Sequence, residues 1–293
     1  MWKADTSSDE LTGHTFFYPL LNRHGDLNAS EAASVRSVVD GLVGGLVMHN
    51  LSLIDPGTGN HTSWGNYGPH WLNDVRSWSD DRGLRALEIL SYLAAAEEVT
   101  GDDAYRKEAE RLRRDHGYHR MLVNAKITDP CDDNHSDDEE SFLPLYTYIM
   151  AYKALGRPRE PEFDAALARF CRIVTPERPS LYLAVCAVGN ATPGAGDAAA
   201  AALVANLRGW PLELIKWSTI NSERDDLRVR TPRGRESHDG PEGVNPLPAA
   251  DGARFKWNAN PYRLDDGDGG NTEGDPGAFL LAYWLARHHG LIE

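Results

Sequence analysis

The sequence is poor in cysteine, and it has no motif that would make a metal or a disulfide framework the basis of its fold. Its 293 residues include 3 cysteines, an odd number, and no two of them stand in a CxxC pair. We therefore expect neither a disulfide framework nor a structural zinc site. A chain of this length can bury enough apolar surface to fold without such cross-links.

Basic residues and long apolar runs are also scarce. The chain has 44 acidic and 30 basic residues and a net charge of −14, which argues against nucleic-acid binding because that binding depends on cationic side chains. No run of about 20 apolar residues is present, so no membrane span is expected. The start of the chain as written lacks the basic and apolar regions of a signal peptide. Glycine-rich phosphate loops, GxSxG and HExxH are absent as well.

The spacing of apolar residues predicts a chain that is almost entirely helical. Apolar residues recur every three or four positions, and no two stretches alternate as a pair of strands would. Asn28 or Ser30 can cap the first helix, and Gly101 followed by Asp102 separates the second helix from the third. The predicted helices cover residues 28–54, 83–99, 102–116, 138–155, 161–173, 178–188, 194–208 and 276–289.

We expect a single all-α domain over residues 1–293. The helices follow one another as hairpins with short connections, which favours an (α/α)-toroid of the six-hairpin kind. About ten helices are recognisable and a closed ring needs about twelve, so the ring is either incomplete at its N-terminus or a pair lies unrecognised within 210–260. The long loops at 55–74 and 224–272 are rich in aromatic residues, which disordered segments lack. Both loops should therefore be ordered and line a cleft.

Much of the acidic surplus is concentrated at residues 5–10, 132–140 and 265–275, each of which includes a predicted helix start. Helix capping explains any one of these clusters, because Ser, Asp and Glu all stabilise the first turn of a helix. The cluster at 132–139, however, holds five acids and a histidine, which is more than a cap needs. Crowded carboxylates raise one another's pKa values, and glycoside cleavage needs one protonated and one ionised carboxyl group. If the toroid is correct, the three clusters face one cleft.

Five residues are the catalytic candidates of this hypothesis. Asp138 or Glu139 is expected to act as the general acid. Asp9 or Asp137 is expected to act as the base or nucleophile. His135 lies within the same cluster and completes the set.

The two long loops supply the substrate-binding candidates. Sugar rings stack on indole rings, and their hydroxyl groups bond to amide side chains. Arginines beside the loops could bind a substrate carboxylate, although pairing with nearby acids is the alternative. For each tryptophan, burial between helices is likewise the alternative. The substrate-binding candidates are Trp64, Asn66, His70, Trp71, Arg82, Trp257, Asn258, Tyr262 and Arg263.

Residues 265–273 are rich in oxygen ligands and invite comparison with a calcium loop. The run lacks the positional pattern of an EF-hand. We expect no metal and no cofactor, with calcium at this run kept as the alternative.

Five segments carry a resemblance to a known family: DTSSDELTGH, TSWGNYGPHWLND, RGLRALEILSYLAAAEEVTGD, NHSDDEESFLPLY and NPYRLDDGDGGNTEGDPGAFLLAYWLARHHG. They resemble an uncharacterised bacterial family of usually secreted, longer proteins found in polysaccharide-degrading bacteria. The helical-hairpin organisation is more distantly similar to toroid glycoside hydrolases and polysaccharide lyases. The resemblance implies a secreted or periplasmic protein whose substrate is an oligosaccharide or polysaccharide.

A glycoside hydrolase is therefore the leading hypothesis for function. The first alternative is a polysaccharide lyase acting on a uronate-containing glycan, with His14, His70, His135 or Tyr262 as the base. The second alternative is a glycan-binding domain without catalysis. No nucleic acid and no membrane is expected as a partner.

Overall fold

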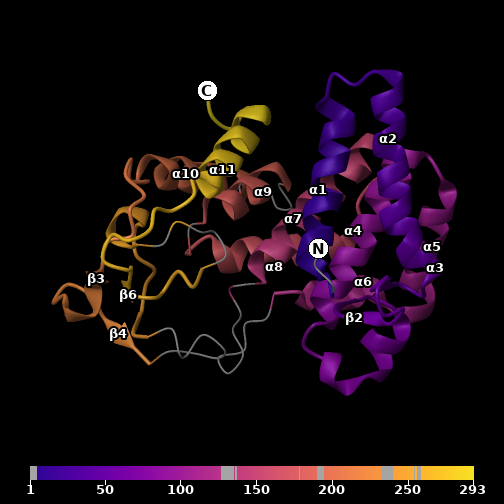
Figure 1. Ribbon diagram of the computed structural model, residues 1–293. Helices are drawn as coiled ribbons and strands as arrows, with labels where there is room; N and C mark the ends of the chain where they lie inside the picture. The colour runs from indigo at the N-terminus through magenta and orange to yellow at the C-terminus, as the bar shows by residue number, and fades with distance from the viewer. Residues whose placement is uncertain are drawn as a thin grey trace. The chain divides into compact units, whose positions relative to one another are not determined.

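The chain folds into two compact units (Figure 1). The first unit comprises Met1–Ala125 and Leu143–Ala166, and the second comprises Lys126–Phe142 and Leu167–Glu293. Helices α7 (Asp138–Ala154) and α8 (Pro161–Val174) contribute residues to both units. The computed structural model describes residues 5–126, 135, 137–177, 179–189, 195–231, 240–253, 255 and 259–293.

The first unit is built around one long buried helix. Its elements are α1 (Ser8–His24), α2 (Ala29–Val39), the π-helical turn η1 (Asp40–Gly44), α3 (Gly45–Met48), β1 (Ser52–Ile54), β2 (His61–Asn66), η2 (His70–Asp74), η3 (Arg76–Trp78), α4 (Arg82–Thr100), α5 (Asp103–His116), α6 (Tyr118–Met121) and η4 (Leu122–Asn124). Helix α4 packs against α1, α2, α5 and α6. Its residues from Gly83 to Glu97 are all buried, as expected of a helix with neighbours on every side.

Local sequence signals account for the ends of α4 and α5. Gly101 adopts a left-handed φ of 75°, which ends α4 at little steric cost. Asp102 then caps α5, because its side chain accepts a hydrogen bond of 2.9 Å from the Ala104 N–H. The helices predicted at 83–99 and 102–116 are confirmed, with small shifts at their ends.

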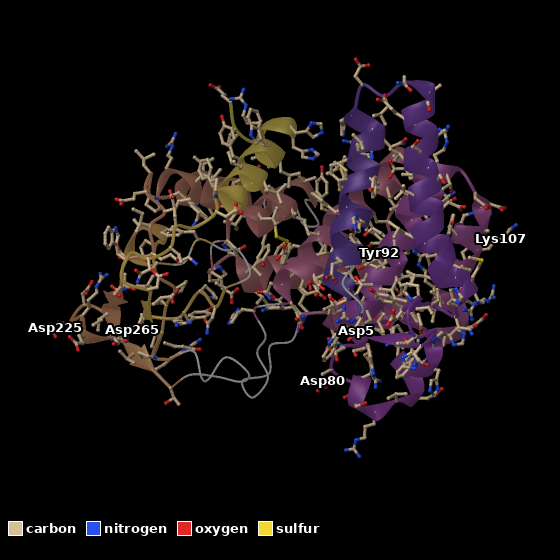
Figure 2. The ribbon with its side chains drawn as sticks, viewed as in Figure 1. Asp5, Asp80, Tyr92, Lys107, Asp225 and Asp265 are labelled. Carbon is tan, nitrogen blue, oxygen red and sulfur yellow. A yellow bond between two sulfur atoms is a disulfide. The ribbon has the colours of Figure 1, made fainter. Side chains whose placement is uncertain are left out.

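Polar side chains are buried where α1 meets α4. The Thr12 Oγ1 and Tyr92 Oη atoms lie 2.5 Å apart; Tyr92 is labelled in Figure 2. Arg85 pairs with Glu88 at 2.9 Å, and both side chains are almost inaccessible to solvent. Because unpaired polar groups are costly in an interior, these contacts favour one packing of α1 on α4.

The long helix predicted over residues 28–54 is interrupted. Helix α2 gives way to the π-helical turn η1 and the short α3, and strand β1 follows. Asn50 and Leu51 have φ values of 54° and 62°, which no helix can accommodate. Gly44 and Gly45 weaken helix formation just before this break.

The second unit combines helices with short strands. Besides its parts of α7 and α8, it contains α9 (Ser180–Gly189), α10 (Ala195–Arg208), β3 (Thr219–Ile220), η5 (Asn221–Glu223), β4 (Val229–Arg230), β5 (Glu242–Gly243), η7 (Ala249–Asp251), β6 (Asp265–Asp266) and α11 (Gly277–His288). Helix α9 packs against both α10 and α11 (Figure 1). The predicted helices at 178–188, 194–208 and 276–289 correspond to α9, α10 and α11.

The described part of the chain is mostly helical, as predicted, and it also contains short strands that were not recognised from the sequence. Strands β1 and β2, β3 and β6, and β4 and β5 form three antiparallel pairs. Pairs of two or three residues are too short to give an alternating pattern, and β3 and β6 are distant in sequence. Among the described residues, no helix has the length and hydropathy that a membrane crossing requires. The ring of helical hairpins stays a prediction.

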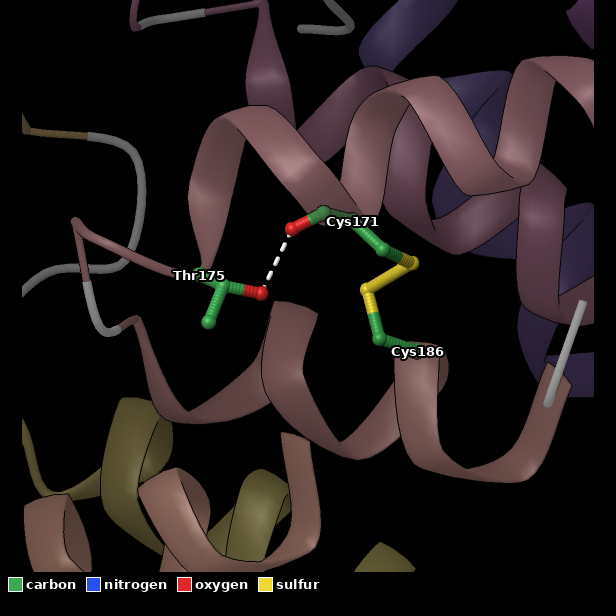
Figure 3. The surroundings of a disulfide bond; sticks show 3 residues. All are labelled: Cys171, Thr175 and Cys186. Atoms are coloured by element: carbon green, nitrogen blue, oxygen red, sulfur yellow. Dashed lines mark hydrogen bonds between the residues drawn. A yellow bond between two sulfur atoms is a disulfide. The ribbon is translucent and has the colours of Figure 1, made fainter. Parts of the chain in front are cut away.

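A disulfide links α8 to α9 in the second unit (Figure 3). It joins Cys171 to Cys186, whose Cα atoms are 5.6 Å apart and which are 15 residues apart in sequence. The sequence analysis expected no disulfide framework and missed this single bond. The residue spacing alone did not reveal it, because only the packing of α8 against α9 brings the two sulfur atoms together.

Candidate functional site

The candidate site forms around Asp138, the first residue of α7. Its side chain is almost fully buried, and the Lys126 Nζ atom lies 2.7 Å from Asp138 Oδ1. Lys126 is itself only 2% exposed. The Nδ1 atom of His135 lies 3.8 Å from Asp138 Oδ2. A buried ammonium group thus stabilises the negative charge of a buried carboxylate.

A second carboxylate, that of Glu177, completes the cluster. Glu177 lies in the turn between α8 and α9. Each of His135, Asp138 and Glu177 offers one side-chain ligand atom, and these three atoms lie within 4.8 Å of one another. The Tyr262 hydroxyl donates to Glu177 Oε1 at 3.4 Å, and the Tyr262 ring lies 5.8 Å from the His135 ring. The site therefore pairs two carboxylates with an imidazole, an ammonium and a phenol.

These three donors could in principle hold a cation. Within the part of the chain that the structure describes, they are the one group of His, Cys, Asp and Glu side chains whose spacing suits a metal ion. The Lys126 ammonium, however, already places a positive charge against Asp138. We therefore treat the cluster as a pair of carboxylates for acid–base chemistry.

Residues 265–273 are the alternative calcium site. Their carboxylates form hydrogen bonds and ion pairs within the second unit. Asp265, labelled in Figure 2, accepts hydrogen bonds from the backbone N–H and hydroxyl of Ser222. Asp266 pairs with Arg263 at 3.3 Å. Asp268 accepts bonds from the backbone N–H groups of Asn271 and Thr272. Within the described residues, these contacts hold the loop rather than gather ligands around one point.

A cavity of about 110 Å³ opens beside Asp138 and Glu177 within the second unit. Its wall comes mainly from the turn before α9, from α9 and α10, and from residues 247–253 and 259–266. Four further polar or aromatic side chains that could contact a sugar line it, namely Asn206, Trp210, Asn260 and Arg263. Small sites of this kind bind ligands through a few placed polar groups on an otherwise apolar wall.

Tyr182 is one of the residues that line this cavity. The residue is fully buried, and its oxygen has no hydrogen-bond partner among the described residues. Burial, and then the charges of Asp138, Glu139 and Glu177, raise the pKa of Tyr182 well above its ordinary value. The phenol of Tyr182 therefore stays protonated at neutral pH.

A buried network fixes Tyr262 next to Glu177. Glu242 is 1% exposed and accepts from Arg230 at 2.9 Å and from Asn260 at 2.8 Å. The Arg230 guanidinium lies 4.1 Å from the centre of the Tyr262 ring, a cation–π contact. The Tyr262 N–H donates to the Asn260 side chain at 2.9 Å. Tyr262 thus has little freedom to move away from the cluster.

The structure divides the predicted site residues between the units. Asp9, Trp64, Asn66, His70, Trp71 and Arg82 belong to the first unit, and His135, Asp137, Asp138, Glu139, Tyr262 and Arg263 belong to the second. The predicted Trp257 and Asn258 lie outside the described residues. Of the second group, His135, Asp138 and Tyr262 meet around Glu177. Arg263 lines the cavity, and Asp137 and Glu139 are half-buried at the start of α7.

The predicted site residues of the first unit differ in their exposure and in the groups that they contact. Asp9 is exposed in the first turn of α1 and accepts a bond from the Ser7 hydroxyl, which matches the capping alternative. Asn66 is 1% exposed and its amide donates to the Thr62 carbonyl at 2.7 Å, so it serves the hairpin. Arg82 is half-buried at the start of α4.

The aromatic candidates lie on strand β2 and on the turn η2 that follows it. Trp64 is 55% exposed on β2. The half-buried Trp71 ring lies 4.8 Å from that of His61 and 5.6 Å from that of His70. Asp5 accepts bonds of 2.6 and 2.9 Å from the N–H and hydroxyl of Ser63, which ties the hairpin to the start of the unit. These aromatic and imidazole groups form a surface suited to a sugar ring.

Sequence reasoning missed Lys126, Glu177 and Tyr182. Glu177 stands in the turn TPERPS between two predicted helices, where a proline on each side marks an ordered turn. That signal was present but pointed to no chemistry. Lys126 and Tyr182 reach the cluster only because the second unit folds around it.

Comparison with known proteins gives no match, either to protein-family models, to curated proteins or to solved structures.

Proposed function

We propose that the protein is a carbohydrate-active enzyme, a glycoside hydrolase that uses Asp138 and Glu177 as its carboxylate pair. One observation carries the proposal: two carboxylates come within 4.8 Å of each other beside a cavity. Hydrolases that retain configuration hold their two carboxyl groups about 5–5.5 Å apart, one as nucleophile and one as acid. The Asp138–Glu177 pair is close enough for such a division of roles.

The surroundings of the two acids favour different roles. Lys126 stabilises the Asp138 carboxylate at 2.7 Å, which suits the nucleophile. Glu177 receives a long hydrogen bond of 3.4 Å from Tyr262 at the edge of the cavity, which suits the proton donor. Trp210, which lines the cavity, would stack on the sugar face.

The substrate of the proposal is an oligosaccharide or polysaccharide, and its place is outside the cytoplasm. The exposed Trp64 of the β1–β2 hairpin supports a carbohydrate ligand, because an indole ring can stack on a sugar ring. The Cys171–Cys186 bond supports an oxidising compartment, since disulfides persist there and are rare in the cytosol. A toroid of helical hairpins remains the proposed arrangement.

A polysaccharide lyase is the second candidate, and one observation favours it. His135 and Tyr262 are neighbours, and Arg263 lines the same cavity. Such a set could abstract the proton beside a uronate carboxylate while the arginine binds that carboxylate. The charges of Asp138 and Glu177 would repel a polyanion, so the hydrolase is the stronger candidate.

A panel of neutral and uronate-containing oligosaccharides tests the proposal. Products are separated by chromatography with and without a chelator, and ultraviolet absorbance reports a new carbon–carbon double bond. Hydrolysis without such absorbance is expected. A rise in absorbance would replace the hydrolase with the lyase. Saturable binding without any product would indicate a non-catalytic glycan-binding domain.

Amide variants of the two acids assign the site. Asp138→Asn and Glu177→Gln should each lower kcat by about 10²–10⁴-fold, because each removes an acid–base or nucleophilic group. The exposed Glu213→Gln, also in the second unit, is the matched control and should keep wild-type turnover. Glu139 is the other acid predicted at the start of α7. The kcat of Glu139→Gln, compared with that of Glu177→Gln, shows which of the two acids works with Asp138. Wild-type turnover in Glu177→Gln would refute the proposed pair.

A further inference from the structure

The disulfide encloses the segment that forms one side of the candidate site. Cys171 and Cys186 are 15 residues apart, and Glu177 lies between them. Pro179, Ser180 and Tyr182 belong to the same enclosed segment and line the cavity. The bond therefore closes a short loop around the residues that shape this wall.

The hydrogen bonds at the start of this loop are local. The Thr175 hydroxyl donates to the Cys171 carbonyl at 2.5 Å (Figure 3), and the Glu177 N–H donates to the Val174 carbonyl at 2.9 Å. These bonds shape the end of α8, but they do not join it to α9. The covalent bond joins the two helices on either side of the turn.

We propose that the Cys171–Cys186 bond is the positioning element of the site, which holds Glu177 against Asp138 in the arrangement that the reaction needs. The inference rests on the proposed function for its catalytic consequence, but not for its structural one. A disulfide that closes a loop of about 15 residues reduces the number of conformations open to the unfolded chain by about 100-fold. This corresponds to about 3 kcal/mol, at about 1.4 kcal/mol per tenfold. A catalytic group displaced by about 1 Å can cost about 100-fold in rate.

Reduction opens the loop without changing any other residue. A dithiol reductant attacks one sulfur atom, the S–S bond breaks, and a second attack within the reductant releases both cysteines as thiols. The two electrons and two protons come from the reductant, which becomes a cyclic disulfide. The wild-type protein can thus be compared with itself in two states.

Thiol counting on the denatured full chain comes first. Of the 3 cysteines, one free thiol is expected before reduction, from Cys131, and all three after it. Three free thiols in freshly purified, unreduced protein would overturn the proposal. Cys131→Ser is the matched control, since it removes the third cysteine and keeps the bond.

Two measurements then report how mobile and how accessible the turn between α8 and α9 is. Both are made on oxidised wild-type protein, on reduced wild-type protein and on the Cys171→Ala/Cys186→Ala variant. Amide hydrogen exchange over residues 175–183 should quicken on reduction by about tenfold or more. Carbodiimide labelling of the Glu177 carboxyl group, read by peptide mass spectrometry, should quicken relative to that of Glu213. Cys131→Ser should match the oxidised wild type. Unchanged exchange and labelling after complete reduction would overturn the proposal. If the double variant fails to fold, the reduced wild type still decides.

Kinetics separate positioning from general stability. Reduction should lower kcat by about 10–100-fold while KM changes little, since the cavity loses an aligned acid rather than its shape. Far-ultraviolet circular dichroism should stay the same. If reduction unfolds part of the protein while kcat of the folded fraction stays unchanged, the bond contributes to stability and not to positioning. That result would overturn the proposal. If oxidised wild type turns over no substrate, the proposed function fails, and the exchange and labelling results still decide the structural claim.

Discussion

At the scale of single residues, the Lys126–Asp138 pair is a buried ion pair whose disruption should be costly. Both side chains are almost completely buried, and 2.7 Å separates Nζ from Oδ1. Removing one member of a buried ion pair leaves an uncompensated charge in the interior. The pair is therefore a structural requirement of the site as well as a part of its chemistry.

Lys126→Met should destabilise the protein by about 3–5 kcal/mol, measured by urea unfolding. The exposed Lys153→Met on α7 is the matched control and should change stability by about 0.5 kcal/mol or less. Lys126→Met/Asp138→Leu should recover most of the loss, because neither charge remains buried. A double variant as unstable as Lys126→Met alone would show that packing, and not the stranded carboxylate, is responsible.

At the scale of elements, the β1–β2 hairpin matters because it displays aromatic side chains on a fixed backbone. A β-carbon on Gly65 would lie 2.5 Å from Leu53 Cδ1, so the two strands pack closely only because position 65 has no side chain. The bonds from Ser63 to Asp5 hold the hairpin from the other side. Trp64 is exposed on a hairpin that is itself well held.

Trp64→Ala should weaken polysaccharide binding without unfolding the protein. Aromatic stacking contributes about 0.5–1.5 kcal/mol, so the dissociation constant should rise about 2- to 10-fold in isothermal titration. Trp284→Ala on α11 is the matched control, because Trp284 is similarly exposed, at 61%, outside the hairpin. Equal weakening in both variants would mean that exposed indoles bind the glycan without a defined site.

At the scale of the whole molecule, buried tyrosines link stability to alkaline pH. Burial raises the pKa of both Tyr146 and Tyr152 to about 12. Tyrosine in an unfolded chain has a pKa of about 10. Between these values the folded state holds protons that the unfolded chain has lost, so the stability contributed by the two phenols is lost as pH rises.

The free energy of unfolding should therefore fall as pH rises from about 10 to about 12, by up to about 1.4 kcal/mol per pH unit for each buried phenol. Urea unfolding at stepped pH, with tyrosinate absorbance recorded on the folded protein, measures both quantities. Tyr146→Phe should reduce the slope by about one proton. Stability that stays constant over this range would contradict the raised pKa values.

The sequence by itself determined the helical elements whose signals are local. The apolar spacing of 83–99, the glycine at 101 and the capping carboxylate at 102 act within a few residues of one another, so they predicted α4 and α5 closely. The acid-rich start of α7 was visible for the same reason, and it contained His135 and Asp138. Tyr262 was named as well, from its aromatic, amide-rich loop.

The tertiary structure alone decided what surrounds those residues. Lys126 lies 12 positions before Asp138, and Glu177 lies between two helices whose pairing no local pattern encodes. The Cys171–Cys186 bond and the β3–β6 pair likewise join segments that meet only after packing. Local propensity acts over one or two helical turns, whereas a catalytic cluster depends on distances between elements that packing sets.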